Sequence, residues 1–170
     1  MCIEPLSYKT LNQAINLVNK IFPYQRNNLQ ENASIALTGS LDRNSLLAKF
    51  LFDFMKITDV NYWVAMDDNG NKVIGITGLY SYLEDKEEAY WLGYTCVDPD
   101  FRGQGIGREL VNLAIAKSRA AGKKFLRLYT SSSPEQANAQ ILYEKKGFRI
   151  TGEEDMEKSN FKMIYRELEL

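Results

Sequence analysis

VDPDFRGQGIGR, residues 97–108, is the stretch that decides the fold of this chain. The residues before it, Trp91–Val97, are aromatic and β-branched, which predicts a strand. Pro99 and Asp100 are turn residues that close this strand. After the stretch, apolar residues recur at helical spacing. The stretch therefore predicts the end of a strand, a glycine-rich loop and the start of a helix.

The three glycines of this loop, Gly103, Gly105 and Gly107, stand at alternate positions. They allow sharp turns and leave no side chains over the backbone amides, which favours binding of an anion such as phosphate at the helix N-terminus. The two common phosphate-loop patterns both fail, because Arg108 occupies the place of the Walker lysine and of the third dinucleotide-loop glycine. What remains is Arg-x-x-Gly-x-Gly, which begins at Arg102. A plain glycine turn before an amphipathic helix is the structural alternative.

A second stretch, QANAQILYEKKGF at residues 136–148, narrows the interpretation. The two stretches together resemble the GNAT acetyltransferase superfamily. In that family Val-x-Pro-x-aromatic-Arg-Gly-x-Gly-Ile-Gly is followed, one helix and one strand later, by Ala-x-x-Leu-Tyr-x-x-x-Gly-Phe. Both motifs occur here in this order and at the usual separation. The specific resemblance covers roughly Tyr90–Phe148, and beyond it only the order of elements agrees.

The resemblance implies an α/β fold with a mixed, mostly antiparallel central sheet, a splayed pair of central strands and flanking helices. Residues 1–170 show no repeat, linker or low-complexity tract, so a single acyl-CoA N-acyltransferase domain is expected. Hydrophobic periodicity predicts strands at Cys2–Leu6, Asn61–Met66, Lys72–Tyr80, Tyr90–Val97, Phe125–Tyr129, Phe148–Thr151 and Lys162–Leu168. It predicts helices at Leu11–Ile21, Asn32–Leu37, Leu46–Met55, Gly105–Ala121 and Glu135–Lys146. Gly75 and Gly78 interrupt a strand pattern and indicate a bulge.

Composition restricts the classes of function. The net charge is −1, so nothing indicates a nucleic-acid partner. No apolar run reaches transmembrane length and no signal peptide is recognisable, so the cytoplasm is expected and a membrane partner is not. The chain contains no histidine and only two cysteines, Cys2 and Cys96, without metal-ligand spacing, so no metal is expected.

The resemblance also assigns the cofactor-binding residues. Backbone amides of the loop would bind the pyrophosphate of acetyl-CoA, and Arg102 and Arg108 would add positive charge nearby. For Arg108, a solvated helix residue is the structural alternative. The central strand would pair with the pantetheine arm through its backbone. The residues assigned to acetyl-CoA in these ways are Thr95, Cys96, Val97, Arg102, Gly103, Gln104, Gly105, Ile106, Gly107 and Arg108.

Tyr143 is the expected catalytic residue. In the family this tyrosine lies by the cofactor sulfur and acts as general acid toward the thiolate; packing in a helix interface is the structural alternative. The family's asparagine seven residues earlier is replaced by Gln136, which we expect to bind the cofactor arm, with Asn138 as the other candidate. Cys96 is interpreted as a small core residue rather than a nucleophile, because the family transfers acetyl directly.

The general base remains open. Glu31, Glu84, Glu87 and Glu88 lie in expected loops and are candidates, as are Tyr90, Tyr94 and a water chain. An amine with a low pKa, such as a peptide α-amine, would need little help. Aromatic residues that would line the acceptor site are Phe22, Pro23, Tyr24, Trp63, Tyr80, Tyr82 and Tyr90.

The expected function is transfer of acetyl from acetyl-CoA to a primary amine of a small molecule, peptide or protein. The alternative is a non-catalytic acyl-CoA-binding sensor or interaction module. An exposed strand edge near the C-terminus would allow two chains to pair as a homodimer.

Overall fold

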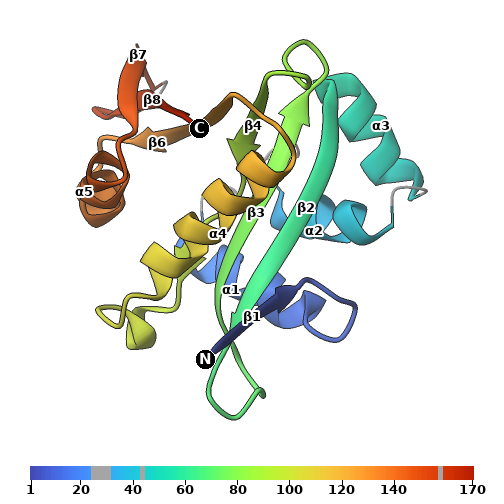
Figure 1. Ribbon diagram of the computed structural model, residues 1–170. Helices are drawn as coiled ribbons and strands as arrows, with labels where there is room; N and C mark the ends of the chain where they lie inside the picture. The colour runs from blue at the N-terminus through green and yellow to red at the C-terminus, as the bar shows by residue number, and fades with distance from the viewer. Residues whose placement is uncertain (24–31, 43–44, 157–158) are drawn as a thin grey trace.

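The computed structural model of the protein describes residues 1–23, 32–42, 45–156 and 159–170. The elements are arranged around one sheet, with helices on both of its faces (Figure 1). In chain order they are β1 (Cys2–Pro5), α1 (Leu11–Ile21), α2 (Ala33–Leu41), α3 (Leu46–Met55), β2 (Ile57–Met66), β3 (Val73–Tyr82), β4 (Ala89–Leu92), β5 (Cys96–Val97), the short 3-10 helix η2 (Pro99–Phe101), α4 (Ile106–Ala120), β6 (Phe125–Ser131), η3 (Pro134–Gln136), α5 (Ala137–Lys145), β7 (Arg149–Asp155) and β8 (Lys162–Glu169).

The sheet has eight strands in the order β1-β2-β3-β4-β6-β8-β7, and β5 pairs with β3 beyond the end of β4. One of its strand pairs, β4 with β6, is parallel, and the others are antiparallel. The mixed, mostly antiparallel sheet flanked by helices that the resemblance implied is therefore confirmed.

The two central strands diverge where the expected strand Tyr90–Val97 is broken. β4 pairs with β6 over Ala89–Trp91, whereas β5 pairs with β3 through Cys96 and Val97. Among the described residues, β5 has no ladder partner on its β6 side. Beyond Arg127, β6 pairs only with β8, so the two strands separate into the expected splay.

A tyrosine ring explains the glycines near this break. Tyr62 of β2 is paired with Gly78 of β3, and its ring carbon Cε1 lies 2.2 Å from where a Cβ of Gly78 would be. The Tyr62 hydroxyl lies 2.9 Å from the corresponding position at Gly93, which follows β4. Gly78 therefore makes room for a ring and does not mark a bulge. The register does shift beside Gly75, between Ala65 and its neighbour, as expected for that glycine.

Helices α1 and α2 cover one face of the sheet, and α4 crosses the other (Figure 1). The apolar stripe of α4 is buried against the sheet along its whole length. The residues of this stripe are Ile106, Leu110, Val111, Ala114 and Ile115, all 9% exposed or less. Ile106, Leu110 and Ala114 belong to the helical spacing that the sequence indicated, whereas Leu113 of that spacing is only partly buried.

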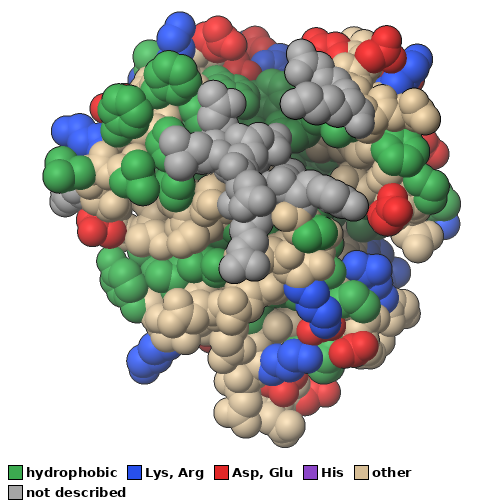
Figure 2. Space-filling model, turned by 180° about the vertical axis from the view of Figure 1, so that it is seen from behind, with side chains coloured by type: hydrophobic (Ala, Val, Ile, Leu, Met, Phe, Trp, Pro, Cys, Tyr) green, Lys and Arg blue, Asp and Glu red, His purple; other side chains and the backbone are tan. Residues whose placement is uncertain are grey.

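Helix α3 behaves differently, although its residues were also expected to form an amphipathic helix. Ala48 and Leu51 are buried. The large apolar residues are exposed on its outer face: Leu46 by 87%, Phe50 by 66%, Phe54 by 65% and Leu47 by 51%. In Figure 2, seen from behind, hydrophobic side chains gather at the upper left over this helix.

Several expected boundaries were wrong for local reasons. β2 begins at Ile57 rather than Asn61, because a register shift at Asp59, whose φ is 53°, lets the strand continue toward α3. α2 runs through Gly39 instead of ending there, since that glycine packs against α3, with the Ala48 Cβ 2.7 Å from its own Cβ position. No helix in the described part of the chain is long and apolar enough to cross a membrane.

Candidate functional site

At the start of α4, the glycine-rich loop presents a row of backbone amides without carbonyl partners in the described part of the chain. Gly103 and Gly105 adopt positive φ values of 78° and 83°, which L side chains rarely adopt. A Cβ at Gly103 would meet no atom within 4 Å, and one at Gly105 would meet only the Arg108 side chain, at 3.4 Å. Within the described residues, no carbonyl accepts a hydrogen bond from the amides of Gly103–Arg108. Such a row favours an anion.

A buried carboxylate fixes the start of this loop. Asp98 accepts from the ammonium groups of Lys20 on α1 and Lys72 before β3, each at 3.0 Å, and from the Asp100 amide at 3.3 Å. Burial alone would raise the pKa of Asp98, but the two lysines and the amide lower it below the ordinary value. Asp98 therefore ties the loop to both α1 and the β2–β3 hairpin. Sequence reasoning gave Asp98 no role, because it named only its neighbours Pro99 and Asp100 as turn residues.

The break between β4 and β5 places three expected site residues beside the splay. Thr95 lies in the break, and its hydroxyl is 2.9 Å from that of Thr77 on β3. Val97 lies in the β5 ladder with Cys96, and its carbonyl accepts from Arg102 Nε at 3.2 Å. The backbone of β5 is thus held from the β3 side and by Arg102, which leaves its other edge toward β6 open.

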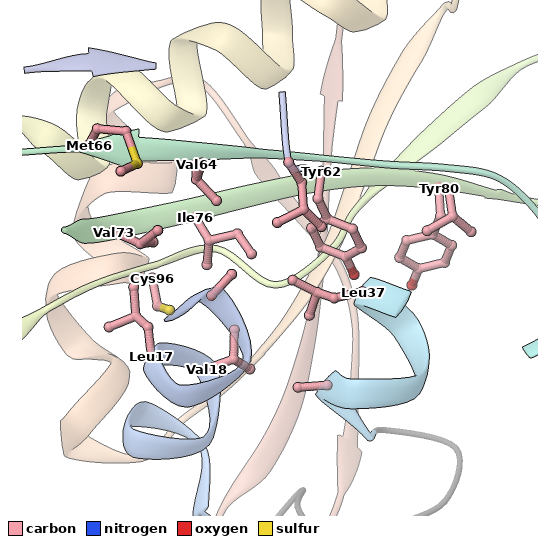
Figure 3. Packing of buried hydrophobic residues seen from close by; sticks show 14 residues of the cluster. Leu17, Val18, Leu37, Tyr62, Val64, Met66, Val73, Ile76, Tyr80 and Cys96 are labelled. Atoms are coloured by element: carbon pink, nitrogen blue, oxygen red, sulfur yellow. The ribbon is translucent and has the colours of Figure 1, made fainter. Parts of the chain in front are cut away.

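Cys96 is a core residue. Its side chain points toward α1, where it packs near Leu17 and Val18 (Figure 3). Burial raises the pKa of its thiol to about 12, so the thiol is protonated at neutral pH. A thiol in this state is a poor nucleophile, which supports the expectation that Cys96 contributes its backbone rather than its sulfur.

Tyr143 lies on α5 with its ring buried, 7% exposed, and packed against Phe148 at 5.6 Å between ring centroids. Burial raises the pKa of the phenol to about 12; Cys96 on β5 acts in the same direction, and Arg166 on β8 acts against it. Leu142, the residue before Tyr143, lies 3.8 Å from the Cβ position of Gly107, and Val97 of β5 lies 3.7 Å from the same position, so α5 lies beside the loop and β5. The phenol holds its proton throughout the neutral pH range.

Arg166 is a functional candidate that sequence reasoning missed. It is only 2% exposed, opposite Leu128 in the β6–β8 ladder. Its NH2 group donates to Glu144 at 2.8 Å and to Gln140 at 3.3 Å, one residue after and three before Tyr143 on α5. Its buried Nε has no partner among the described residues. No motif signals it, because its position depends on how α5 packs over β8.

Comparison with known proteins agrees with this geometry. Residues 58–150 match the family model described as an acetyltransferase (GNAT) domain, which is more than half of the chain. The chain belongs to the GNAT acetyltransferase family. It is 27% identical over 121 residues to an uncharacterized N-acetyltransferase of Methanocaldococcus jannaschii, covering 70% of this chain and 51% of that protein. It is 30% identical over 111 residues to a peptidyl-lysine N-acetyltransferase of Salmonella typhimurium, covering 65% of this chain and 64% of that protein.

A solved structure shows the same fold over the whole chain. The crystal structure of an aminoglycoside 6'-N-acetyltransferase complexed with coenzyme A aligns with a TM-score of 0.73, at 14% identity, over 99% of this chain and 97% of that one. The chain spans about half the length of the first curated relative. GNAT acetyltransferases use acetyl-CoA. The question for this chain is therefore whether its glycine-rich loop and β5 offer the groups that acetyl-CoA needs.

The residues of this GNAT domain fit acetyl-CoA. The open amides at Gly103–Arg108 suit a pyrophosphate, and the free edge of β5 suits an amide-containing arm. Of the residues expected at the loop, Gln104 and Arg108 expose their side chains, whereas Ile106 buries its side chain and offers only its amide. Arg108 pairs with Glu109 at 3.6 Å and stays largely exposed. The described residues contain no cluster that could hold a metal ion.

Gln136 and Asn138 have different environments. The side-chain carbonyl of Gln136 accepts from the hydroxyl of Thr130 and from the amide of Ser131, at 3.1 Å for the latter. The Gln136 carbonyl therefore accepts both hydrogen bonds from the end of β6. Its NH2 group is the part of the side chain that remains to contact a cofactor arm. Asn138 is exposed in the first turn of α5. Neither residue is established as a ligand, and both stay predictions.

The charged loop before β4 takes part in an ion-pair network with β6 and β8. Arg127 of β6 donates to Asp85 at 2.8 Å, to Glu88 at 2.6 Å and to Glu167 at 2.7 Å. Trp91 also donates to Asp85 at 2.8 Å. Glu88 is therefore engaged in an ion pair and is a weak candidate for general base. This network fixes the end of the parallel β4–β6 pair where the splay begins.

Aromatic residues expected to line the acceptor site fall into two groups. Tyr80 and Tyr82 are 5.3 Å apart on the α1 side of the sheet, and Tyr82 lies 5.4 Å from Trp91. Phe22, at the end of α1, lies on the same side of the sheet, and its ring centroid is 6.0 Å from that of Tyr94. By contrast, Trp63 and Tyr90 lie on the opposite face of the sheet, on the α4 side. The ammonium group of Lys117 lies over the Trp63 ring, and that of Lys123 lies over the Tyr90 ring. Tyr24 and Glu31 lie outside the described residues.

Proposed function

We propose that this GNAT domain transfers acetyl from acetyl-CoA directly to a primary amine, with Tyr143 as the general acid. The observation that carries the proposal is the convergence of three features at one end of the splay. These are the open amides of Gly103–Arg108, the free edge of β5 and the buried phenol of Tyr143. Acetyl-CoA would supply the acetyl thioester.

Each part of the chain has a separate task in this proposal. The amides of Gly103–Arg108 bind the pyrophosphate, and the β5 backbone at Cys96 and Val97 orients the arm that carries the thioester. Tyr143 holds a proton on Oη because burial keeps its pKa high, and it donates that proton as the sulfur leaves. Arg166 reduces the cost of the phenolate left behind.

The acceptor is proposed to be a primary amine that enters from the α1 side, where Tyr82, Trp91 and Tyr94 lie. Three carboxylates at this edge of the described structure, Asp85, Glu88 and Glu167, are paired with Arg127. An amine of low pKa is favoured, since it is partly neutral at physiological pH without a strong base. The peptidyl-lysine and aminoglycoside activities in the names of related proteins make those two classes worth including in the test.

The test is thiol release from acetyl-CoA over peptide N-termini, lysine peptides, polyamines, aminoglycosides and amino acids, each against a blank without amine. Release that depends on one class would support the enzyme and name its acceptor. Tyr143→Phe should lower turnover about 10–1,000-fold with little change in acetyl-CoA affinity. Tyr8→Phe is the matched control, because Tyr8 is exposed near the N-terminus. Acetyl-CoA binding without release on any amine would favour the alternative, a non-catalytic acyl-CoA sensor.

A further inference from the structure

The outer face of α3 is the most exposed apolar surface on a helix in the described structure. Leu46, Leu47, Phe50 and Phe54 form this face, which we call the α3 stripe, and Phe50 and Phe54 stack at 6.5 Å between ring centroids. Single exposed apolar residues are ordinary, but a contiguous stripe of four large ones indicates a surface that another molecule covers. None of the roles in the proposed reaction uses this stripe.

Charged residues lie along one flank of the stripe only. Lys49 and Asp53 are exposed one helical turn apart, and neither has an ion-pair partner among the described residues. At 100° per residue, both side chains lie beside Leu46, on the side away from Phe54. The face therefore presents an apolar centre and one flank that carries a cation followed by an anion.

We propose that a second copy of this chain covers the α3 stripe, with the two α3 helices antiparallel about a twofold axis between Phe50 and Leu51. In that arrangement Leu46 of one helix faces Phe54 of the other, and Phe50 faces its own copy. Both charged flanks lie on the same side of the pair and run in opposite directions. Lys49 of each helix then comes beside Asp53 of the other, whereas a parallel pair about a twofold axis would put the two charged flanks on opposite sides and bring no such ions together.

The free edge of the sheet is a poorer site for this pairing. β7 is an edge strand, and Glu153, Glu154 and Asp155 stand in succession on it. Charged residues on an edge strand discourage pairing with a second edge. The homodimer expected at the C-terminal edge is therefore better placed at α3.

The size of the interface sets the expected affinity. A ten-residue helix is about 15 Å long. Such a contact falls below the ordinary interface of about 800 Å² per partner, so we expect a dissociation constant of about 1–100 μM. Sedimentation velocity of the full chain from about 1 to 300 μM covers the range in which this dimer would form and dissociate.

Four variants test the arrangement in the same experiment. Phe50→Glu should leave a monomer at every concentration. Lys49→Asp should weaken association about tenfold or more, because it places Asp residues against each other. Adding Asp53→Lys to that change should restore the dimer, since both pairs are then reversed and opposite again. Lys124→Asp is the charge-matched control on an exposed residue far along the chain, and it should dimerise like the unmodified protein.

Ile150→Lys separates the two candidate surfaces, because Ile150 is half exposed on β7. Loss of the dimer in this variant, with Phe50→Glu still dimeric, would place the interface at the strand edge and overturn the proposal. A monomer at 300 μM for the unmodified chain would also overturn it. Failure of the double charge reversal to restore association would reject the antiparallel pairing. Thermal melting shows that each variant is folded, and these outcomes do not depend on acetyl transfer.

Discussion

Helices α3 and α4 have the same kind of sequence pattern and opposite roles in the molecule. Each has large apolar residues at helical spacing and charged residues on its remaining surface. α4 buries its stripe fully against the sheet, with Leu110 at 0% exposure. α3 buries Ala48 and Leu51 and leaves Leu46, Phe50 and Phe54 outside.

The two helices show that periodicity identifies an apolar face but not what covers it. On α4 the covering partner is the chain's own sheet, and the helix is proposed to function through its N-terminus, where Gly105 leaves amides open. On α3 the proposed partner is another molecule, and the helix functions through its side. The following predictions test this contrast, from the largest expected effect to the smallest.

The two ends of α4 should differ most. Gly105 and Gly122 flank the helix with similar φ values of 83° and 73°. Gly105→Glu should weaken acetyl-CoA binding about 100-fold or more, because a carboxylate enters the anion site. Gly122→Glu carries the same backbone strain and the same charge, so it should cost stability but not binding. Calorimetric titration checks both, and equal losses of affinity would remove the loop from the site.

Truncation of one leucine on each helix compares the two stripes. Leu110→Ala should lower the free energy of unfolding by about 2–5 kcal/mol, because it opens a cavity under α4. Leu46→Ala should change it by less than about 0.5 kcal/mol, since that side chain is in solvent in the monomer. Denaturant unfolding at low protein concentration measures both. A Leu46→Ala cost similar to that of Leu110→Ala would mean that the monomer itself covers the stripe.

Helix α5 offers a third case, because its buried residue, Tyr143, is the one proposed to be catalytic. If Arg166 acts through Tyr143, Arg166→Met should lower turnover about tenfold in the unmodified enzyme. In a Tyr143→Phe background the same change should have almost no further effect on turnover, because the two residues act as a unit. A purely structural role would give additive losses. Turnover and acetyl-CoA affinity of the four proteins form the cycle, and Arg166→Lys tests whether charge alone suffices.

The effect that is smallest at neutral pH concerns stability, because it develops only at alkaline pH. The folded pKa values of Cys96 and Tyr143 are raised to about 12 from ordinary values of 9.0 and 10.0. A raised folded pKa means that the unfolded state releases its proton first, so stability is complete below about pH 9 and falls as the pH rises toward 12. Each group should contribute a slope of about 1.4 kcal/mol per pH unit within its window. Cys96→Ala should remove the part that begins near pH 9 and should retain acetyl transfer.

Much of this site could be read from local sequence. The positions of Gly103 and Gly105 before a helix predict open amides, because glycine accepts the positive φ values that such a loop needs. The Leu-Tyr-x-x-x-Gly-Phe pattern identified Tyr143 and its partner Phe148, which pack together as the family motif implies. These signals are local, since each depends on residues within a few positions of one another.

Other contributors depend on contacts that are distant in the sequence. Asp98 lies 78 residues from Lys20, and Arg127 lies 40 residues from Glu167, so no spacing rule connects them. The break between β4 and β5 lies beside the Tyr62 ring of β2, which packs over Gly78 of β3 and over Gly93 after β4. The expected continuous strand Tyr90–Val97 could not reveal this.

The sequence by itself determined the family, the mixed sheet and the phosphate-type loop, because these follow from short motifs and from the periods of strands and helices. Only the tertiary structure decided that Arg166 donates to Gln140 and Glu144 of α5, that Glu88 is held by Arg127, and that the α3 stripe faces outward. The physical reason is that burial and ion pairing are properties of a completed packing. The neighbouring residues in the chain determine a residue's local conformation. Its burial and its ion pairs depend on elements that are distant in the sequence.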